Sequence, residues 1–188
     1  DENEDNFEDK DNFTTMEKKS AFGPASLSGF YLGITLIIFS LLLFLLDIDL
    51  ESPFRYISYI IVAAGLFWSM ISYRDKYMDG FLDYKGAFSA GFYTGLIASL
   101  IAGIFAYVYA QYIDIGLTEE ILMQAETEML ENNPNMTDEQ IDQALTMTEK
   151  FTSPAMMGVW GFVGNLVVST ILSLIIAIFA KRENKNVA

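Results

Sequence analysis

The stretch AFSAGFYTGLIASLIAG, residues 87–103, combines an apolar composition with small residues at a regular spacing. The small residues recur at every fourth position, as Ala87, Gly91, Gly95, Ser99 and Gly103. Residues four apart lie above one another on an α-helix, so these five form one face that is almost without side chains. Membrane helices associate through close backbone approach, dispersion and interhelical hydrogen bonds. The stretch therefore predicts a membrane helix that packs against another helix along this face.

The rest of the 188-residue chain contains further apolar blocks of similar length. Hydrophobic residues make up 52% of the sequence, and they gather in blocks that carry no charge between their end turns. About 20 apolar residues span a bilayer as a helix. We therefore expect an all-α integral membrane protein, with a membrane domain at 22–182 and four transmembrane helices at 27–46, 54–73, 86–112 and 154–180.

The last apolar block has a second strip of mostly small residues, made of Gly161, Asn165, Ser169, Ser173 and Ala177. The first block has a shorter one, made of Ala25, Gly29 and Gly33. We expect the two long strips to pack on each other or on the first helix, and contact with another protein molecule is the alternative. Asn165 is the only strongly polar side chain that lies deep in one of the predicted spans. We interpret it as an interhelical hydrogen-bond donor, and contact with a substrate or ion is the alternative.

Basic residues predict how the helices are oriented. Nine of the eleven lie near the two ends of the chain or between the second and third helices, namely Lys10, Lys18, Lys19, Arg74, Lys76, Lys85, Lys181, Arg182 and Lys185. Lysine and arginine near helix ends stay on the cytoplasmic side of a membrane. We therefore expect both termini to be cytoplasmic and residues 113–153 to be extracytoplasmic.

The segment between the third and fourth helices has the punctuation of an amphipathic helical hairpin, predicted over residues 117–151. Thr118 is expected to cap the first hairpin helix, and Thr137 with Gln140 forms a capping-box pattern for the second. The sequence ENNPN, residues 131–135, separates the two helices. Ten acidic residues against one lysine in 113–153 predict a strongly negative outer surface.

The N-terminal residues 1–21 are interpreted as an acidic cytoplasmic tail, and residues 183–188 as a short C-terminal one. Residues 1–15 hold seven acids and one lysine, too polar a composition to fold alone. A solvated tail is one interpretation. The other is a docking segment for a basic partner surface, with Phe7 and Phe13 as apolar anchors. Met16 before EKK resembles a natural start, so residues 1–15 could also be foreign to the protein.

The sequence offers little for catalysis or cofactor binding. It has no cysteine and no histidine, which removes thiolate chemistry, disulfides and the commonest general base and metal ligand. Asp75, Asp79 and Asp83 would share a helical face and suit Mg²⁺, but the basic residues beside them favour a self-neutralised loop. We expect no catalytic, cofactor-binding or metal residues, and a protein that is not an enzyme.

Several features together resemble a known family. DYKGAFSAGFYTGLIASLIAGIFAYVYAQYID, residues 83–114, is followed by TDEQIDQALTMTEKFTSP, residues 137–154, and by a glycine-rich last helix. This order resembles a bacterial inner-membrane family filed as domain of unknown function 4199, over about residues 22–182. The resemblance implies four spans in the bacterial inner membrane with a periplasmic hairpin. It implies no activity and no functional residues.

These observations favour a non-catalytic accessory or scaffold subunit of a larger membrane protein complex. Its contacts would be the small-residue faces, the acidic hairpin and the acidic tail. The alternative is a small transporter or channel-forming homo-oligomer for ions or lipids, although the spans lack the ionisable groups that ion-coupled carriers use. We expect the lipid bilayer as a further partner. We expect no nucleic-acid partner, because the chain has a net charge of −14.

Overall fold

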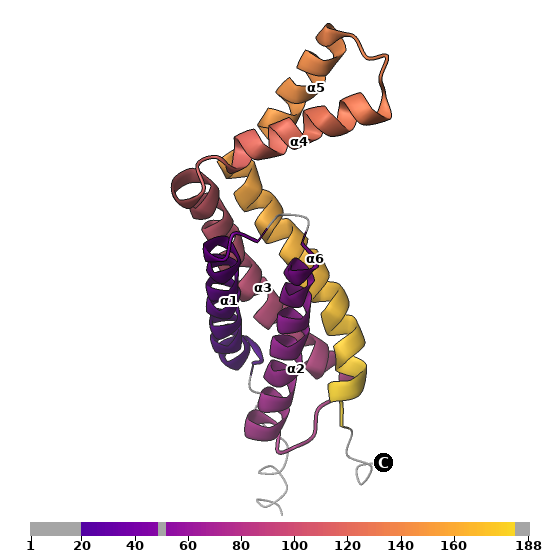
Figure 1. The fold of residues 1–188 in the computed structure, drawn as a ribbon. Coiled ribbons are helices and arrows are strands. Elements are labelled where there is room, and N and C mark those ends of the chain that lie inside the picture. Colours follow the sequence, from indigo (N-terminus) through magenta and orange to yellow (C-terminus); the bar gives the residue numbers. More distant parts are fainter. Residues whose placement is uncertain (1–19, 49–51, 183–188) are drawn as a thin grey trace, which may run out of the picture.

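The computed structural model describes residues 20–48 and 52–182, and the chain there is helical. The α-helices are α1 (Phe22–Leu45), α2 (Ile57–Tyr77), α3 (Tyr84–Val108), α4 (Leu117–Asn132), α5 (Asp138–Phe151) and α6 (Pro154–Ala180). A 3₁₀ turn, η2 (Pro53–Tyr56), precedes α2, and a π-helical turn, η3 (Tyr109–Ile113), follows α3. Figure 1 shows α1, α2, α3 and α6 as a bundle with α4 and α5 at one end.

Four of these helices are long and apolar enough to cross a membrane, which confirms the predicted number. Two of these helices extend beyond the predicted spans. The first helix begins at Phe22 rather than at position 27, and α2 continues through charged residues to Tyr77. Backbone hydrogen bonds form regardless of side-chain polarity, so a helix extends past the apolar residues that mark its span.

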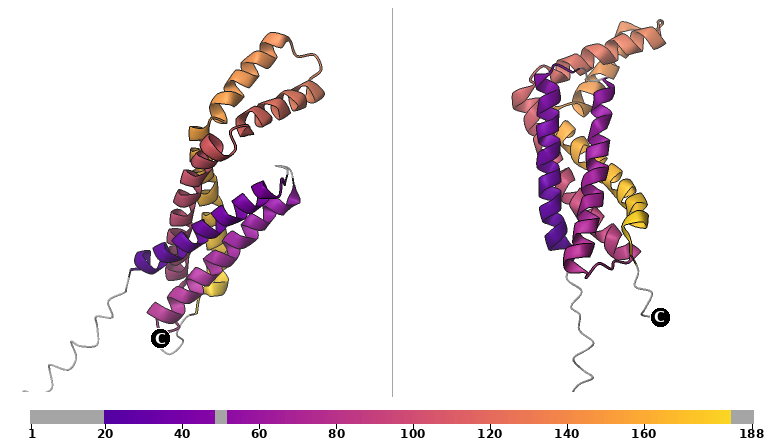
Figure 2. Two further views of the ribbon diagram at one scale, coloured as in Figure 1. Left: turned by 60° about the vertical axis from the view of Figure 1, so that its left-hand side comes forward. Right: turned by 60° about the horizontal axis from the view of Figure 1, so that its bottom comes forward.

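Helix α3 lies at the centre of the bundle. Its most extensive contact is with α6, and it also packs against α1 and α2. In Figure 2, α1 lies beside α2, α3 lies beside α6, and the two pairs diverge toward the end that carries α4 and α5. A tightly packed cluster at the opposite end contains Met70 of α2, Ala87 and Ala90 of α3, and Ala177 of α6. The bundle is therefore closed at one end and wider at the other.

Helices α4 and α5 form an arm, residues 117–151, that projects from the wide end of the bundle (Figure 1). The two helices contact each other, whereas the contact between α5 and α6 is slight. The predicted capping box is confirmed, because the Thr137 hydroxyl accepts from the Gln140 amide and the Gln140 side chain accepts from the Thr137 amide. Pro154 opens α6 in its first turn, as predicted.

The predicted cap at Thr118 is wrong. Helix α4 begins one residue earlier, at Leu117, with Gly116 in the capping position. The Thr118 hydroxyl donates instead to the carbonyl oxygen of Thr152, at 3.3 Å. This bond joins the start of α4 to the end of α5, so it holds together the base of the arm.

Candidate functional site

The small-residue strips of α3 and α6 face each other. A Cβ atom built on Gly91 would lie 2.7 Å from the Ser173 hydroxyl oxygen, and one built on Gly95 would lie 2.5 Å from the Cβ of Ser169. Real Cβ atoms essentially never approach other atoms below 3.0 Å. The two helix backbones therefore lie closer together than any larger residue at Gly91 or Gly95 would allow.

The same contact continues toward the wide end of the bundle. A Cβ on Gly103 would lie 2.7 Å from the Cβ of Phe162 and 2.8 Å from the carbonyl oxygen of Gly158. One on Gly161 would lie 3.0 Å from the Cβ of Ala106. At the other end of the strips, Ala87 and Ala177 are fully buried. The strips thus form one continuous helix–helix interface.

The short strip of α1 packs on a different side of α3. A Cβ on Gly29 would lie 2.6 Å from the carbonyl oxygen of Thr94 and 2.8 Å from the Cβ of Ile97. One on Gly33 would lie 3.0 Å from the Ile101 side chain. Helix α3 thus packs closely on both α6 and α1, the two partners that the sequence left open.

Asn165 makes a hydrogen bond within its own helix. Its side-chain amide donates to the carbonyl oxygen of Gly161, one turn earlier in α6, at 2.8 Å. Asparagine, serine and threonine side chains often bond to a nearby backbone carbonyl in this way. The side chain is half-buried and also lines a cavity, described below. The hydrogen bond of this amide therefore lies within α6, whereas the sequence predicted one between helices.

Thr94, which sequence reasoning did not single out, makes the interhelical polar contact. Its hydroxyl oxygen is fully buried in the bundle, 2.6 Å from the Ser69 hydroxyl of α2. It also lies 3.2 Å from the carbonyl oxygen of Ala25 in α1 and 2.8 Å from that of Ala90 in α3. This one hydroxyl links three helices. Elsewhere in the described residues, the buried Ser99 and Ser173 hydroxyls have no hydrogen-bond partner.

A cavity of about 520 Å³ occupies the wide end of the bundle, where the two helix pairs diverge. Its walls come from α1, α3 and α6, with Ser58 from the start of α2 and Leu117 and Glu120 from the base of α4. Apolar and aromatic side chains, among them Leu36, Leu43, Phe105 and Met157, share the lining with polar groups. Asn165 lies in the wall beside Gly161. The sequence pattern gave no sign of this cavity.

Three carboxylates line the cavity at the end of the bundle that carries the arm, which we call the mouth of the cavity. Asp47 follows α1, Asp114 follows η3, and Glu120 lies in the first turn of α4. The Tyr109 hydroxyl donates to Asp114 at 3.2 Å. Across residues 20–48 and 52–182, no group of three or more His, Cys, Asp or Glu side chains lies close enough to hold a metal ion. The mouth thus carries three carboxylates from three separate segments.

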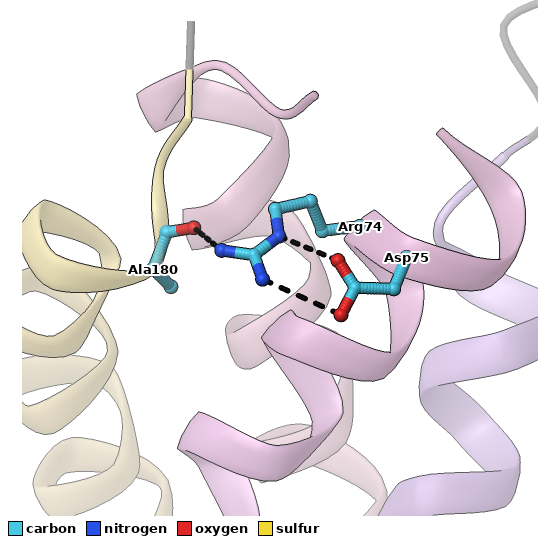
Figure 3. A network of polar contacts seen from close by, with 3 residues as sticks. All are labelled: Arg74, Asp75 and Ala180. Atoms are coloured by element: carbon cyan, nitrogen blue, oxygen red, sulfur yellow. Dashed lines mark hydrogen bonds and ion pairs between the residues drawn. The ribbon is translucent and has the colours of Figure 1, made fainter. Parts of the chain in front are cut away.

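The narrow end of the bundle is held by polar contacts. Figure 3 shows the Arg74 guanidinium donating to the carbonyl oxygen of Ala180, at 3.2 Å, and pairing with Asp75 at 2.7 Å. Leu82 and Arg182 exchange two backbone hydrogen bonds of 2.8 Å. The end of α2 and the loop after it are thereby fastened to the end of α6.

The acidic residues considered for Mg²⁺ have separate local roles. Asp75 pairs with Arg74, whereas Asp83 caps α3 by accepting from the Gly86 amide at 3.0 Å. Asp79 adopts a positive φ of 50° in the turn between α2 and α3. Two of the three carboxylates thus serve ion pairing and helix capping. Phe7 and Phe13 lie outside the described residues, so docking through them stays a prediction.

Comparisons with known proteins complete this description. No curated protein and no solved structure matches the chain. One family model matches residues 27–182, which include all four long helices except the start of α1. Its description is "Protein of unknown function (DUF4199)". The match confirms the predicted resemblance, and the chain belongs to this family.

Proposed function

We propose that this protein is a non-catalytic accessory or scaffold subunit of a larger complex in the bacterial inner membrane. The distribution of basic residues supports an orientation with both termini in the cytoplasm and the arm in the periplasm. In this orientation the arm is presented to the periplasmic part of a partner.

The arm is the observation that carries the proposal. It projects from the bundle, and Leu117 and Ile141 are the residues that it buries. Large apolar side chains stay exposed on it, among them Met123 and Met147 at 57% and 61%. Large exposed apolar patches mark surfaces that bind other proteins, and we propose that these side chains form part of one. The acidic composition of the arm favours a basic partner surface.

The small-residue strips contribute to this function indirectly. Those of α3 and α6 bury each other, and that of α1 packs on α3, so these faces build the bundle that carries the arm. We therefore place the partner contact on the arm and, as a second contact, on the acidic N-terminal tail. The lipid-facing sides of the four long helices are available to the bilayer and to a partner's helices.

Purification of the tagged protein from its native membrane in a mild detergent tests the proposal. Mass spectrometry of the eluate should find a larger membrane protein in a fixed ratio to this chain. A variant with neutral side chains at exposed arm positions, Glu126→Gln, Glu128→Gln and Glu131→Gln, should retain less of that partner. Deletion of residues 1–15 tests the tail separately. Recovery of the chain alone, or as a homo-oligomer, would contradict the proposal.

The second candidate is a small transporter or channel-forming homo-oligomer for ions or lipids. The cavity between the helix pairs favours it, because transport requires a binding site inside the bundle. The residues that line the cavity belong to the wide end, whereas the narrow end is closed by the Met70 and Ala87 cluster. We therefore rank this function second. Flux of ions or labelled lipids into liposomes containing the protein would raise it to first.

A further inference from the structure

We propose that the cavity at the wide end of the bundle binds an amphipathic organic cation. The apolar body of such a ligand would lie between the diverging helix pairs, and its positive group would lie at the acidic mouth. This inference does not depend on the accessory role, because it concerns a site inside the chain rather than a contact with a partner.

The size and walls of the cavity support an organic ligand. Its volume of about 520 Å³ lies within the roughly 300–1,000 Å³ typical of small-molecule sites. The lining extends along α1 from Leu36 to Phe44, which is roughly 12 Å at 1.5 Å per residue. Apolar side chains dominate this length, so an elongated or bulky hydrophobic body would fit it. The half-buried Asn165, together with Ser40 and Ser58, adds polar groups to the wall.

The charge of the mouth selects the sign of the ligand. Asp47, Asp114 and Glu120 contribute three carboxylates, and no lysine or arginine is found among the described residues that line the cavity. An anionic ligand would be repelled by the carboxylates and would find no cation in the wall to pair with. A positive ligand would be attracted electrostatically by each of the three carboxylates.

The arrangement of the carboxylates favours an organic cation over a metal ion. They come from three separate segments, and the described part of the chain has no cluster that could hold a metal. An ammonium or phosphonium group needs no closed ligand shell, and it also interacts well with aromatic faces. Phe44 and Tyr109 line the same cavity as the carboxylates. Their ring centroids lie 5.6 Å apart in an edge-to-face arrangement.

A pair of probes with the same shape and opposite charge tests the proposal. Tetraphenylphosphonium is an apolar cation, and tetraphenylborate is the matching anion. Binding of each to the full chain in phosphatidylcholine nanodiscs would be measured by equilibrium dialysis, with empty nanodiscs subtracted. We expect saturable binding of one tetraphenylphosphonium per chain and no saturable binding of tetraphenylborate.

Three variants locate the binding. The mouth variant Asp47→Asn, Asp114→Asn, Glu120→Gln should weaken binding about tenfold, since each exposed ion pair contributes modestly. The control variant Glu126→Gln, Glu128→Gln, Glu131→Gln removes the same charge from the arm outside the cavity and should bind as the unchanged chain does. Ser40→Trp places a bulky indole at the cavity wall and should weaken binding by obstructing the site. Circular dichroism would check the fold of each variant.

Several results would overturn the proposal. They are equal binding of the two probes, equal weakening by the mouth and control variants, or unchanged binding after Ser40→Trp in a folded protein. Addition of an aminolipid to the nanodiscs then distinguishes two sources of the ligand. Competition by the aminolipid would identify a lipid headgroup as the natural cation, and undiminished binding would identify a soluble amphipathic cation.

Discussion

The contact between Gly103 of α3 and the backbone of α6 makes Gly103→Ala a sensitive test of the bundle. The added Cβ would lie 2.8 Å from the carbonyl oxygen of Gly158 and 3.0 Å from the amide nitrogen of Phe162. Both are backbone atoms, which a rotamer change cannot move. Ordinary contact begins at 3.4 Å, so the two helices must separate by roughly 0.6 Å. This separation loosens the close packing of α3 against α6 around Gly103.

Gly164→Ala in α6 is the matched control, because no atom lies within 4 Å of a Cβ built at that position. Both changes replace a glycine inside a helix, and each gains about 1 kcal/mol in helix propensity. That gain cancels when the two variants are compared. The difference that remains is the overpacking cost at Gly103, about 1 to 3 kcal/mol.

The free energy of unfolding would be measured by titration with sodium dodecyl sulfate in mixed micelles, followed by far-ultraviolet circular dichroism. We expect Gly164→Ala to be as stable as the unchanged chain or slightly more stable, and Gly103→Ala to unfold at lower detergent fraction. Equal stability of the two variants would refute the close α3–α6 contact described above.

Three smaller predictions concern polar contacts. Thr94→Val removes the hydroxyl that bonds to Ser69 and should lower the free energy of unfolding by about 1 kcal/mol in the same assay. Thr94→Ser keeps the hydroxyl and should retain most of that free energy. Arg74→Ala removes the donor to the Ala180 carbonyl and should speed amide exchange in the last turn of α6, while exchange at the wide end stays unchanged. Thr137→Ala should cost the arm about 1 kcal/mol of helix stability and speed amide exchange at the start of α5, without changing the unfolding of the bundle.

The helices and their small-residue faces follow from short-range patterns, which is why the sequence predicts them well. The spacing of Gly91, Gly95 and Gly103 depends only on the helical repeat, and long apolar blocks reflect the thickness of a bilayer. The capping box at Thr137 is equally local. Which helix meets which face is a different matter, because α1 and α6 both offer small residues to α3, and only the folded chain assigns them.

The cavity and the polar contacts depend on how far helices diverge, which no local pattern encodes. Leu36, Phe105 and Met157 are ordinary apolar residues of three helices, and they line a cavity only because the helix pairs separate at one end. Polar side chains inside helices are ambiguous for a related reason. Asn165 bonds to its own helix and Thr94 joins three helices, although both choices were open to either residue.

The internal use of the small-residue strips decides which experiment can identify a partner surface. A bulky residue at Gly95 would separate α3 from α6, so loss of a partner in that variant would report a damaged bundle as readily as a lost contact. The arm is different, because its contact with the bundle is slight and its charged side chains are exposed. Neutral residues at Glu126, Glu128 and Glu131 leave the α3–α6 contact intact. Loss of a partner from a variant of the arm that unfolds normally therefore assigns the contact to the arm, and retention of the partner moves the contact to the lipid-facing helices or to the N-terminal tail.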